Sequence, residues 1–184
     1  MATIHPDAWV SPSAVVRGDV TIGPGSRILD LVVLQGELGP VTIGADVVVM
    51  EHALVRGRRD HPVHIGDSVL VGPHTHLNGT VVEDEVFVAT GVSMFPGSRA
   101  GTGSELRVRS TLHVNSRLEP GTTVPIGWIA AGDPAQLFAP GQHDELWAVQ
   151  EPLDFPGTVY GVERGTSMRE IMRRQSQAFG PHTG

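Results

Sequence analysis

Apolar side chains recur every six residues along most of this chain. Four positions after most of these aliphatic residues stands a small or β-branched residue, so each six-residue unit has two apolar or small positions at constant spacing. A hexapeptide period is typical of a parallel β-helix, in which each repeat is one short strand that cannot bury its apolar side alone. The aliphatic series runs Ile4, Val10, Val16, Ile22, Ile28, Leu34, Ile43, Val49, Val55, Ile65, Val71 and Leu77, and resumes after one shortened step from Val82 to Val124.

The repeats predict one β-helix domain over residues 1–130, with about seven coils. Two irregularities, between Leu34 and Ile43 and between Val55 and Ile65, are expected to be small loops. The second contains a polar stretch, residues 57–64, that is a candidate for contact with a ligand or a neighbouring subunit.

A C-terminal extension over residues 131–184 shows a different pattern, which predicts two helices packing on the coil. The first is expected over 144–151, before a proline, and the second over 167–178, where Ser167 and Glu170 form a capping box. Between them, residues 152–165 are interpreted as an extended connection with Phe155 and Tyr160 as anchors.

Composition narrows the possible chemistry. The chain has 184 residues with 23 glycines, 14 prolines and only 18% charged residues, as expected for tightly turning strands. Cysteine is absent, so thiolate nucleophiles and thiolate metal ligands are excluded. A net charge of -7 argues against nucleic acid or an anionic membrane as partner. Since the chain shows neither a membrane-length apolar run nor a leader, we expect a cytoplasmic location.

Three strands per coil place equivalent residues in columns, with neighbours about 4.8 Å apart. One column, after the aliphatic position of the third face, is Arg17, Gln35, Arg56, Asn78, Phe95 and His113. A second column, on the second face, is Ser13, Leu31, His52, His74, Gly91 and Arg109. His52 and His74 are therefore expected to be neighbours.

Over about residues 4–138 the chain resembles the γ-class carbonic anhydrase family. The resemblance rests on the segments 18–23, 36–44, 65–67 with 71–72, and 131–135, which read GDVTIG, GELGPVTIG, IGD with VG, and AGDPA. It implies a left-handed β-helix, a homotrimer and a closing C-terminal helix. It also implies a zinc ion held by three histidines, one of them from a neighbouring subunit.

At the positions that the resemblance assigns to those histidines, this chain has Arg56, Pro73 and Asn78. Proline cannot ligate zinc, and arginine repels a cation. Where the family has Arg-Gly-Asp the chain has Gln-Gly-Glu, so that Glu37 keeps the acidity, and Glu51 keeps it in the next motif. We therefore expect no metal at the family position and no carbonic anhydrase activity.

The leading hypothesis is a metal-independent lyase or hydratase that acts on a small anionic substrate at the subunit interface. Arg56 would supply the positive charge that zinc otherwise supplies, and imidazoles would move protons near neutral pH. The expected substrate-binding residues are Arg56, Asn78, Gln35 and His52, and the expected catalytic residues are His74, His76 and Glu51, which orients an imidazole.

Several alternatives remain open. Arg56 could form a salt bridge to Glu51 or Glu37 that merely fills the vacated position. His52, His74 and His76 could form a relocated site for zinc or another metal, or stack on the surface without a role. The segment His61-Pro-Val-His64 is similar to the loop of hexapeptide acetyltransferases that carries their catalytic histidine, so His61 or His64 could serve acyl transfer. A non-catalytic trimeric subunit of a larger assembly is the last alternative.

Overall fold

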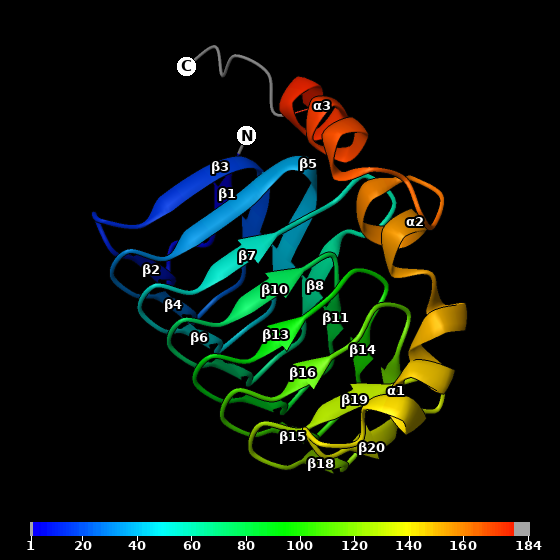
Figure 1. Cartoon of the computed structure of the whole chain (residues 1–184). Helices are drawn as coiled ribbons and strands as arrows, with labels where there is room; N and C mark the ends of the chain where they lie inside the picture. The colour runs from blue at the N-terminus through cyan, green and yellow to red at the C-terminus, as the bar shows by residue number, and fades with distance from the viewer. Residues whose placement is uncertain (1, 179–184) are drawn as a thin grey trace.

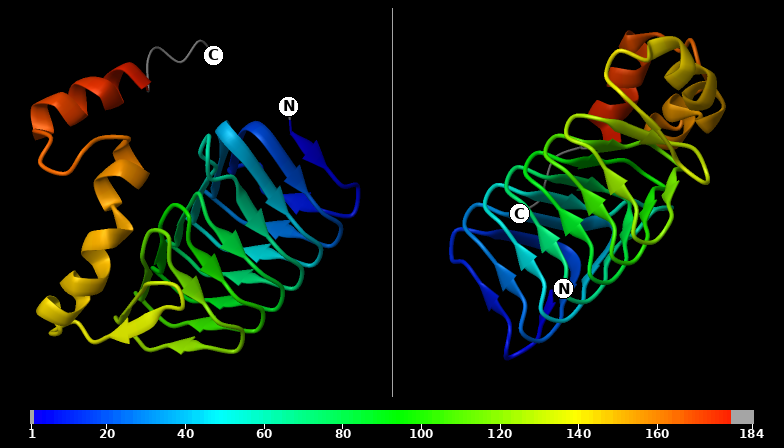
Figure 2. Two further views of the ribbon diagram at one scale, coloured as in Figure 1. Left: turned by 90° about the vertical axis from the view of Figure 1, so that its right-hand side faces the viewer. Right: turned by 90° about the horizontal axis from the view of Figure 1, so that it is seen from below.

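A parallel β-solenoid of about seven turns, with short helices after its last coil, makes up residues 2–178, which the computed structural model describes (Figure 1). The predicted left-handed β-helix with C-terminal helices is therefore confirmed. From the last coil the extension runs back along one side of the solenoid toward its first coils (Figure 2). Among these residues, no helix has the length and apolar character needed to cross a lipid bilayer.

The strands lie on three faces of the coil and pair in parallel with the strands one coil away. The first face contains β1 (Thr3–Ile4), β8 (Val63–Ile65), β11 (Val81–Val82), β14 (Arg99–Ala100) and β17 (Arg117–Leu118). The second contains β2 (Trp9–Val10), β4 (Arg27–Ile28), β6 (Val48–Val49), β9 (Leu70–Val71), β12 (Phe87–Val88), β15 (Glu105–Leu106) and β18 (Thr123–Val124). The third contains β7 (Leu54–Arg56), β10 (His76–Asn78), β13 (Ser93–Met94), β16 (Thr111–Leu112) and β19 (Ile129–Ala131). The long strands β3 (Val15–Ile22) and β5 (Val33–Ile43) run from the third face to the first, and β20 (Gln136–Phe138) pairs antiparallel with β19.

The aliphatic residues that recur every six positions form the hydrophobic core of the solenoid. On the third face, Leu34, Val55, Leu77, Met94 and Leu112 are completely buried and occupy matching positions in successive coils. Burying such a stack removes a continuous apolar surface from water, which no single repeat could do. The aliphatic series of the sequence therefore marks the inward positions.

The second recurring position lies at the corners, where small hydroxyl side chains join neighbouring coils. Ser26 is fully buried, and its Oγ donates to the Gly44 carbonyl at 2.8 Å while it accepts from the Val47 amide at 3.0 Å. A hydroxyl at this position satisfies backbone groups that the turn leaves unpaired. Small residues are thus required there for both space and hydrogen bonding.

Only one of the two predicted loops is present. Residues between Leu34 and Ile43 continue as a single strand, β5, which pairs with β3 on both sides of an irregularity near Gly18. The two chains approach so closely that a Cβ added at Gly36 would lie 2.1 Å from the Asp19 carbonyl oxygen. Glycine at this corner lets the strand bend where we expected a loop.

The second predicted loop is confirmed as a short excursion. Its turn is closed by two backbone hydrogen bonds, from the Arg58 amide to the His61 carbonyl at 2.9 Å and from the His61 amide to the Arg58 carbonyl at 3.2 Å. The chain then re-enters the coil as β8. From this turn the His61 side chain lies against Gly79 and Gly97 of later coils.

Both predicted C-terminal helices exist, with bounds close to those expected, but the expected extended connection is wrong. The extension contains α1 (His143–Gln150), the 3-10 helix η1 (Glu151–Leu153), α2 (Phe155–Tyr160) and α3 (Met168–Ala178). Pro152 and Pro156 stand in the first turns of η1 and α2, where a missing N–H costs nothing. Proline therefore begins new helical turns here, where the sequence predicts that it ends helical structure. The prediction for residues 179–184 lies outside the described part of the chain.

Helix α1 packs on the last coil through Leu146, which joins a small buried cluster with Ala131 and Phe138. Because β20 pairs antiparallel with β19, the sheet continues to Phe138, below this helix.

Helix α3 begins as expected, since the Glu170 amide donates to Ser167 Oγ at 3.3 Å. The Glu170 carboxylate does not turn back to the N-terminus. It accepts hydrogen bonds from Arg173 at 2.8 Å and 2.9 Å and from Arg174 at 2.7 Å. These bonds, first from Arg173 and then from Arg174, lower the pKa of Glu170 to about 2.

Replacing Arg173 and Arg174 together with glutamine is expected to return the pKa of Glu170 toward 4.5, because the carboxylate loses both charged donors. The stabilisation that this group gives α3 is present above about pH 4.5 and is lost as the pH falls through about 2. An NMR titration of the Glu170 carboxyl carbon measures this pKa. In the control Arg169→Gln, on the same helix, it should stay near 2; a value near 4.5 in the unaltered protein would contradict the prediction.

Candidate functional site

The candidate site lies on the outer surface of the third face. Strand pairing places Gln35 beside Arg56 and Arg56 beside Asn78, in adjacent coils. Phe95 and His113 follow in the next two coils, one residue beyond the paired Met94 and Leu112. The column expected from the sequence is therefore confirmed.

Arg56 is held in place by a chain of hydrogen bonds. Its Nε donates to Gln35 Oε1 at 2.8 Å, and Gln35 Nε2 donates to Glu37 Oε2 at 3.0 Å. Gln35 thus positions Arg56 through its side-chain oxygen, and its side-chain nitrogen carries a second N–H besides the one donated to Glu37.

His76 and Asn78 lie next to Arg56 on β10. His76 is half-buried, with its ring edge-on to Phe95 at a centroid distance of 6.3 Å. Burial, and then the charge of Arg56, lower the pKa of His76 below 6.5. Asn78 is 5% exposed, and its buried Oδ1 has no hydrogen-bond partner within residues 2–178. The site therefore combines a fixed cation, a neutral imidazole at pH 7 and an unused acceptor.

Replacing Arg56 with glutamine is expected to raise the pKa of His76, because one of the two causes of its depression disappears. Because the pKa of His76 is lowered, the folded state binds fewer protons than the unfolded state. The contribution of His76 to the free energy of unfolding therefore falls as the pH drops below 6.5. NMR titration of the His76 ring protons measures the change, with Arg109→Gln as control, an exposed arginine two coils beyond His74 in the second column. An unchanged His76 titration in the Arg56 variant would show that burial alone sets its pKa.

Aromatic side chains of α2 cover the column at its later coils, where Phe95 and His113 lie. The Phe155 ring lies 5.5 Å from Phe95 and 5.7 Å from His113 between centroids, and Tyr160 packs on Phe155 at 6.1 Å. His113 is 6% exposed; burial lowers its pKa, and its Nδ1 has no hydrogen-bond partner in the described structure. We had interpreted Phe155 and Tyr160 as anchors, and nothing in the sequence indicated that Phe155 packs on this column.

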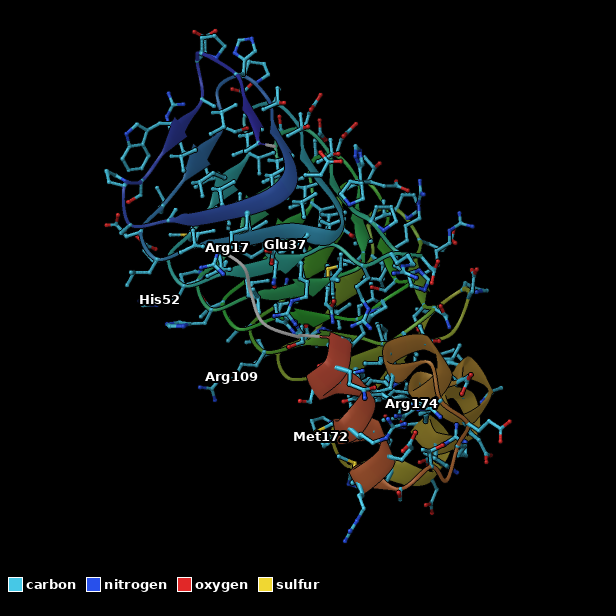
Figure 3. All side chains as sticks on the ribbon, turned by 90° about the horizontal axis from the view of Figure 1, so that it is seen from above. Arg17, Glu37, His52, Arg109, Met172 and Arg174 are labelled. Carbon is cyan, nitrogen blue, oxygen red and sulfur yellow. The ribbon has the colours of Figure 1, made fainter. Side chains whose placement is uncertain are left out.

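The remaining predicted site residues lie at the corner before β10. The rings of His52 and His74 stack at 4.9 Å with an interplanar angle of 9°, as expected from the second column. Both residues have left-handed backbone conformations and are exposed, and Figure 3 shows His52 projecting away from the coil. Glu51 accepts the His74 amide through its backbone carbonyl at 3.1 Å, but within the described residues its carboxylate orients no imidazole.

The predicted site is thus divided into two groups. The face group contains Gln35, Arg56, His76 and Asn78, and the corner group contains Glu51, His52 and His74. Among residues 2–178 there is no cluster of three or more His, Asp or Glu side chains that could hold a metal ion. His52, His74 and His76 therefore do not form a relocated metal site within one subunit.

The three positions that the resemblance assigns to zinc ligands do not fit that ion. Arg56 presents a guanidinium, Pro73 has no donor atom, and Asn78 offers one amide oxygen. Pro73 lies at the corner, in an apolar hollow of about 530 Å³ on the second face. No catalytic step can be assigned to a metal at these three residues.

The two histidines of the acyl-transfer alternative face different surroundings. His61 is half-buried and lines a pocket with Arg58, Arg59 and Tyr160. His64 is exposed on β8 and borders a hollow with Glu83. The hollow at His64 also contains Arg99, but the carboxylates of Glu83 and Asp84 line it together with that arginine.

Comparison with known proteins agrees with this architecture. The chain is 30% identical to gamma carbonic anhydrase 1, mitochondrial, of Arabidopsis thaliana over 149 residues, which are 78% of this chain and 52% of that protein. It is 27% identical over 143 residues to the carnitine operon protein CaiE of Escherichia coli, covering 78% of this chain and 70% of CaiE. The chain spans about half the length of the plant relatives. No family model matches it.

Among solved structures, the acyltransferase LpxA of Bacteroides fragilis superimposes with a TM-score of 0.62 at 13% identity, over 98% of this chain and 90% of LpxA. That likeness concerns the fold. The protein is a hexapeptide-repeat β-solenoid. More particularly, the chain belongs to the γ-carbonic anhydrase-like family.

Proposed function

We propose that this protein is a metal-independent lyase or hydratase that binds a small carboxylate at Arg56. The observation that carries the proposal is the position of His76, a half-buried imidazole whose pKa is lowered by burial and by Arg56 itself. A neutral imidazole beside a fixed cation can take a proton from a substrate whose carboxylate the cation holds. His76 would accept the proton from an attacking water or from the carbon next to the carboxylate, and return it later.

Other residues of the face group support this chemistry. Gln35 and Glu37 hold Arg56 in one orientation, which lowers the entropy lost on binding. The Oδ1 of Asn78 is buried and unpaired within residues 2–178, so it would accept a hydrogen bond from a hydroxyl of the substrate only after a side-chain movement that exposes it. Phe95 and Phe155 give the site an apolar wall that excludes water on one side.

The site would be completed at a subunit interface, as the family resemblance implies. The second face supports an oligomer, because its hollow is lined by Met50, Pro73, Phe87, Val108 and Ile126, and large apolar side chains remain exposed there. In a homotrimer the corner group of one subunit, His52 and His74 with Glu51, would approach the face group of the next. This arrangement would reunite the residues that a single subunit keeps apart.

A crystal structure of the oligomer soaked with acetate or lactate tests the proposal. We expect the carboxylate density to lie against the Arg56 guanidinium, between two subunits, and we expect no carbonic anhydrase activity in solution. Density at Arg56 from a partner's own carboxylate, with no added anion bound, would instead support the alternative of a site filled by a salt bridge.

Acyl transfer is the second candidate, because His61 lines a pocket that contains Arg58, Arg59 and Tyr160. There His61 would deprotonate an acceptor for attack on an acyl thioester. Acetyl-coenzyme A should then raise the melting temperature, and a His61→Gln variant should lose transfer. If neither carboxylates nor acetyl-coenzyme A bind, the non-catalytic trimeric subunit becomes the better interpretation.

The plant relatives have names that place them in mitochondria, so the cytoplasmic location of this protein stays a prediction.

A further inference from the structure

A second pocket, separate from the Arg56 column, lies between the turn at residues 58–61 and helix α2. It has a volume of about 440 Å³. Its lining residues are Leu38, Arg58, Arg59, Asp60, His61, Gly157, Thr158, Tyr160 and Gly161. Two segments about 100 residues apart in sequence thus form its two sides.

Arg58 joins these two sides. Its Nη2 donates to the Val159 carbonyl of α2 at 2.5 Å, and its side chain is half-buried. Neither Arg58 nor Arg59 has a carboxylate oxygen within 4.0 Å among residues 2–178, although Asp60 also borders the pocket. Burial, and then the nearby charge of Arg56, lower the pKa of Arg58. A half-buried guanidinium without a counter-ion is costly unless an anion accompanies it.

We propose that this pocket binds a doubly charged oxyanion of the phosphate type, such as a phosphate monoester, through Arg58 and Arg59. The planar guanidinium fork matches phosphate oxygens, and two adjacent permanent cations suit a dianion better than a monocarboxylate. His61 and the Tyr160 hydroxyl supply further polar groups from the two sides of the pocket. The proposal does not depend on the chemistry assigned to Arg56.

Titration of the full-length oligomer with inorganic phosphate, followed by calorimetry and by melting temperature, tests the inference. Phosphate should bind and raise the melting temperature of both the unaltered protein and the Arg56→Gln variant, whereas acetate at equal ionic strength should not raise that of Arg56→Gln, which lacks the proposed carboxylate site. Arg59→Gln, an exposed position that leaves the bond to α2 intact, should weaken phosphate binding about tenfold or more. Arg58→Gln should weaken it at least as much.

Two controls separate this site from other effects. Arg169→Gln, an exposed arginine on α3, should bind phosphate as the unaltered protein does. Arg56→Gln should retain phosphate binding while it loses carboxylate binding, so this proposal and the proposed function can fail independently. Undiminished phosphate binding in both Arg58→Gln and Arg59→Gln, equal loss in Arg169→Gln, or no binding to the unaltered protein would each overturn the inference.

Discussion

Replacing Arg56 with glutamine is expected to reduce the affinity for small carboxylates a hundredfold or more, about 3 kcal/mol, and to abolish turnover. The substrate's carboxylate loses its charged partner, and the adjacent His76 no longer faces an anchored substrate. Glutamine keeps much of the side-chain length, so the neighbouring Gln35 and Asn78 retain their packing. Calorimetric binding of the carboxylate found in the soaked crystals measures the change.

Arg17 provides a matched control for this substitution. It belongs to the same column, beside Gln35 and two coils from Arg56, and it is exposed. Arg17→Gln removes the same charge from the same face, so it should change affinity only slightly through long-range potential. Equal losses in the two variants would mean that the whole face attracts anions and that Arg56 has no specific role.

Truncating Leu77 to alanine is expected to destabilise the protein by about 2–5 kcal/mol. Leu77 is completely buried between Val55 and Met94, and neighbouring coils cannot collapse onto the cavity because their backbone pairing sets their spacing. Since the residue lies between His76 and Asn78, the site should lose order as well. Denaturant unfolding at fixed protein concentration measures the loss.

Met172→Ala serves as the comparison, because this similarly sized apolar side chain is 46% exposed on α3. Its cost should stay below about 0.5 kcal/mol. A Leu77 variant as stable as the Met172 variant would show that the column is not packed as the structure indicates.

The sequence predicted the coil and its register well, for a physical reason that is local. Each inward position must be aliphatic and each corner position must be small or able to adopt a left-handed backbone, so one period specifies both the fold and the columns. The stacking of His52 on His74 and the order Gln35, Arg56, Asn78 followed from counting alone. The same counting could not show that glycines carry β5 round a corner without a loop.

The candidate site was predicted less completely. Counting repeats predicts which residues are neighbours in successive coils. It does not predict how close two columns lie to each other within one coil. His74 and His76 are two residues apart in sequence, yet a corner separates the exposed ring of His74 from the half-buried ring of His76. The proposed catalytic group is therefore divided within one subunit.

By itself, then, the sequence determined the repeat and the inward residues, because both depend on spacing along the chain. The replacement of three histidines stays a prediction that rests on the family resemblance. Only the tertiary structure decided that Phe155 walls the Arg56 column and that Arg58 reaches the Val159 carbonyl. Those contacts join a turn and a helix that lie far apart in sequence and share no period with the coil. Their formation depends on how the extension packs against the solenoid, which no local pattern specifies.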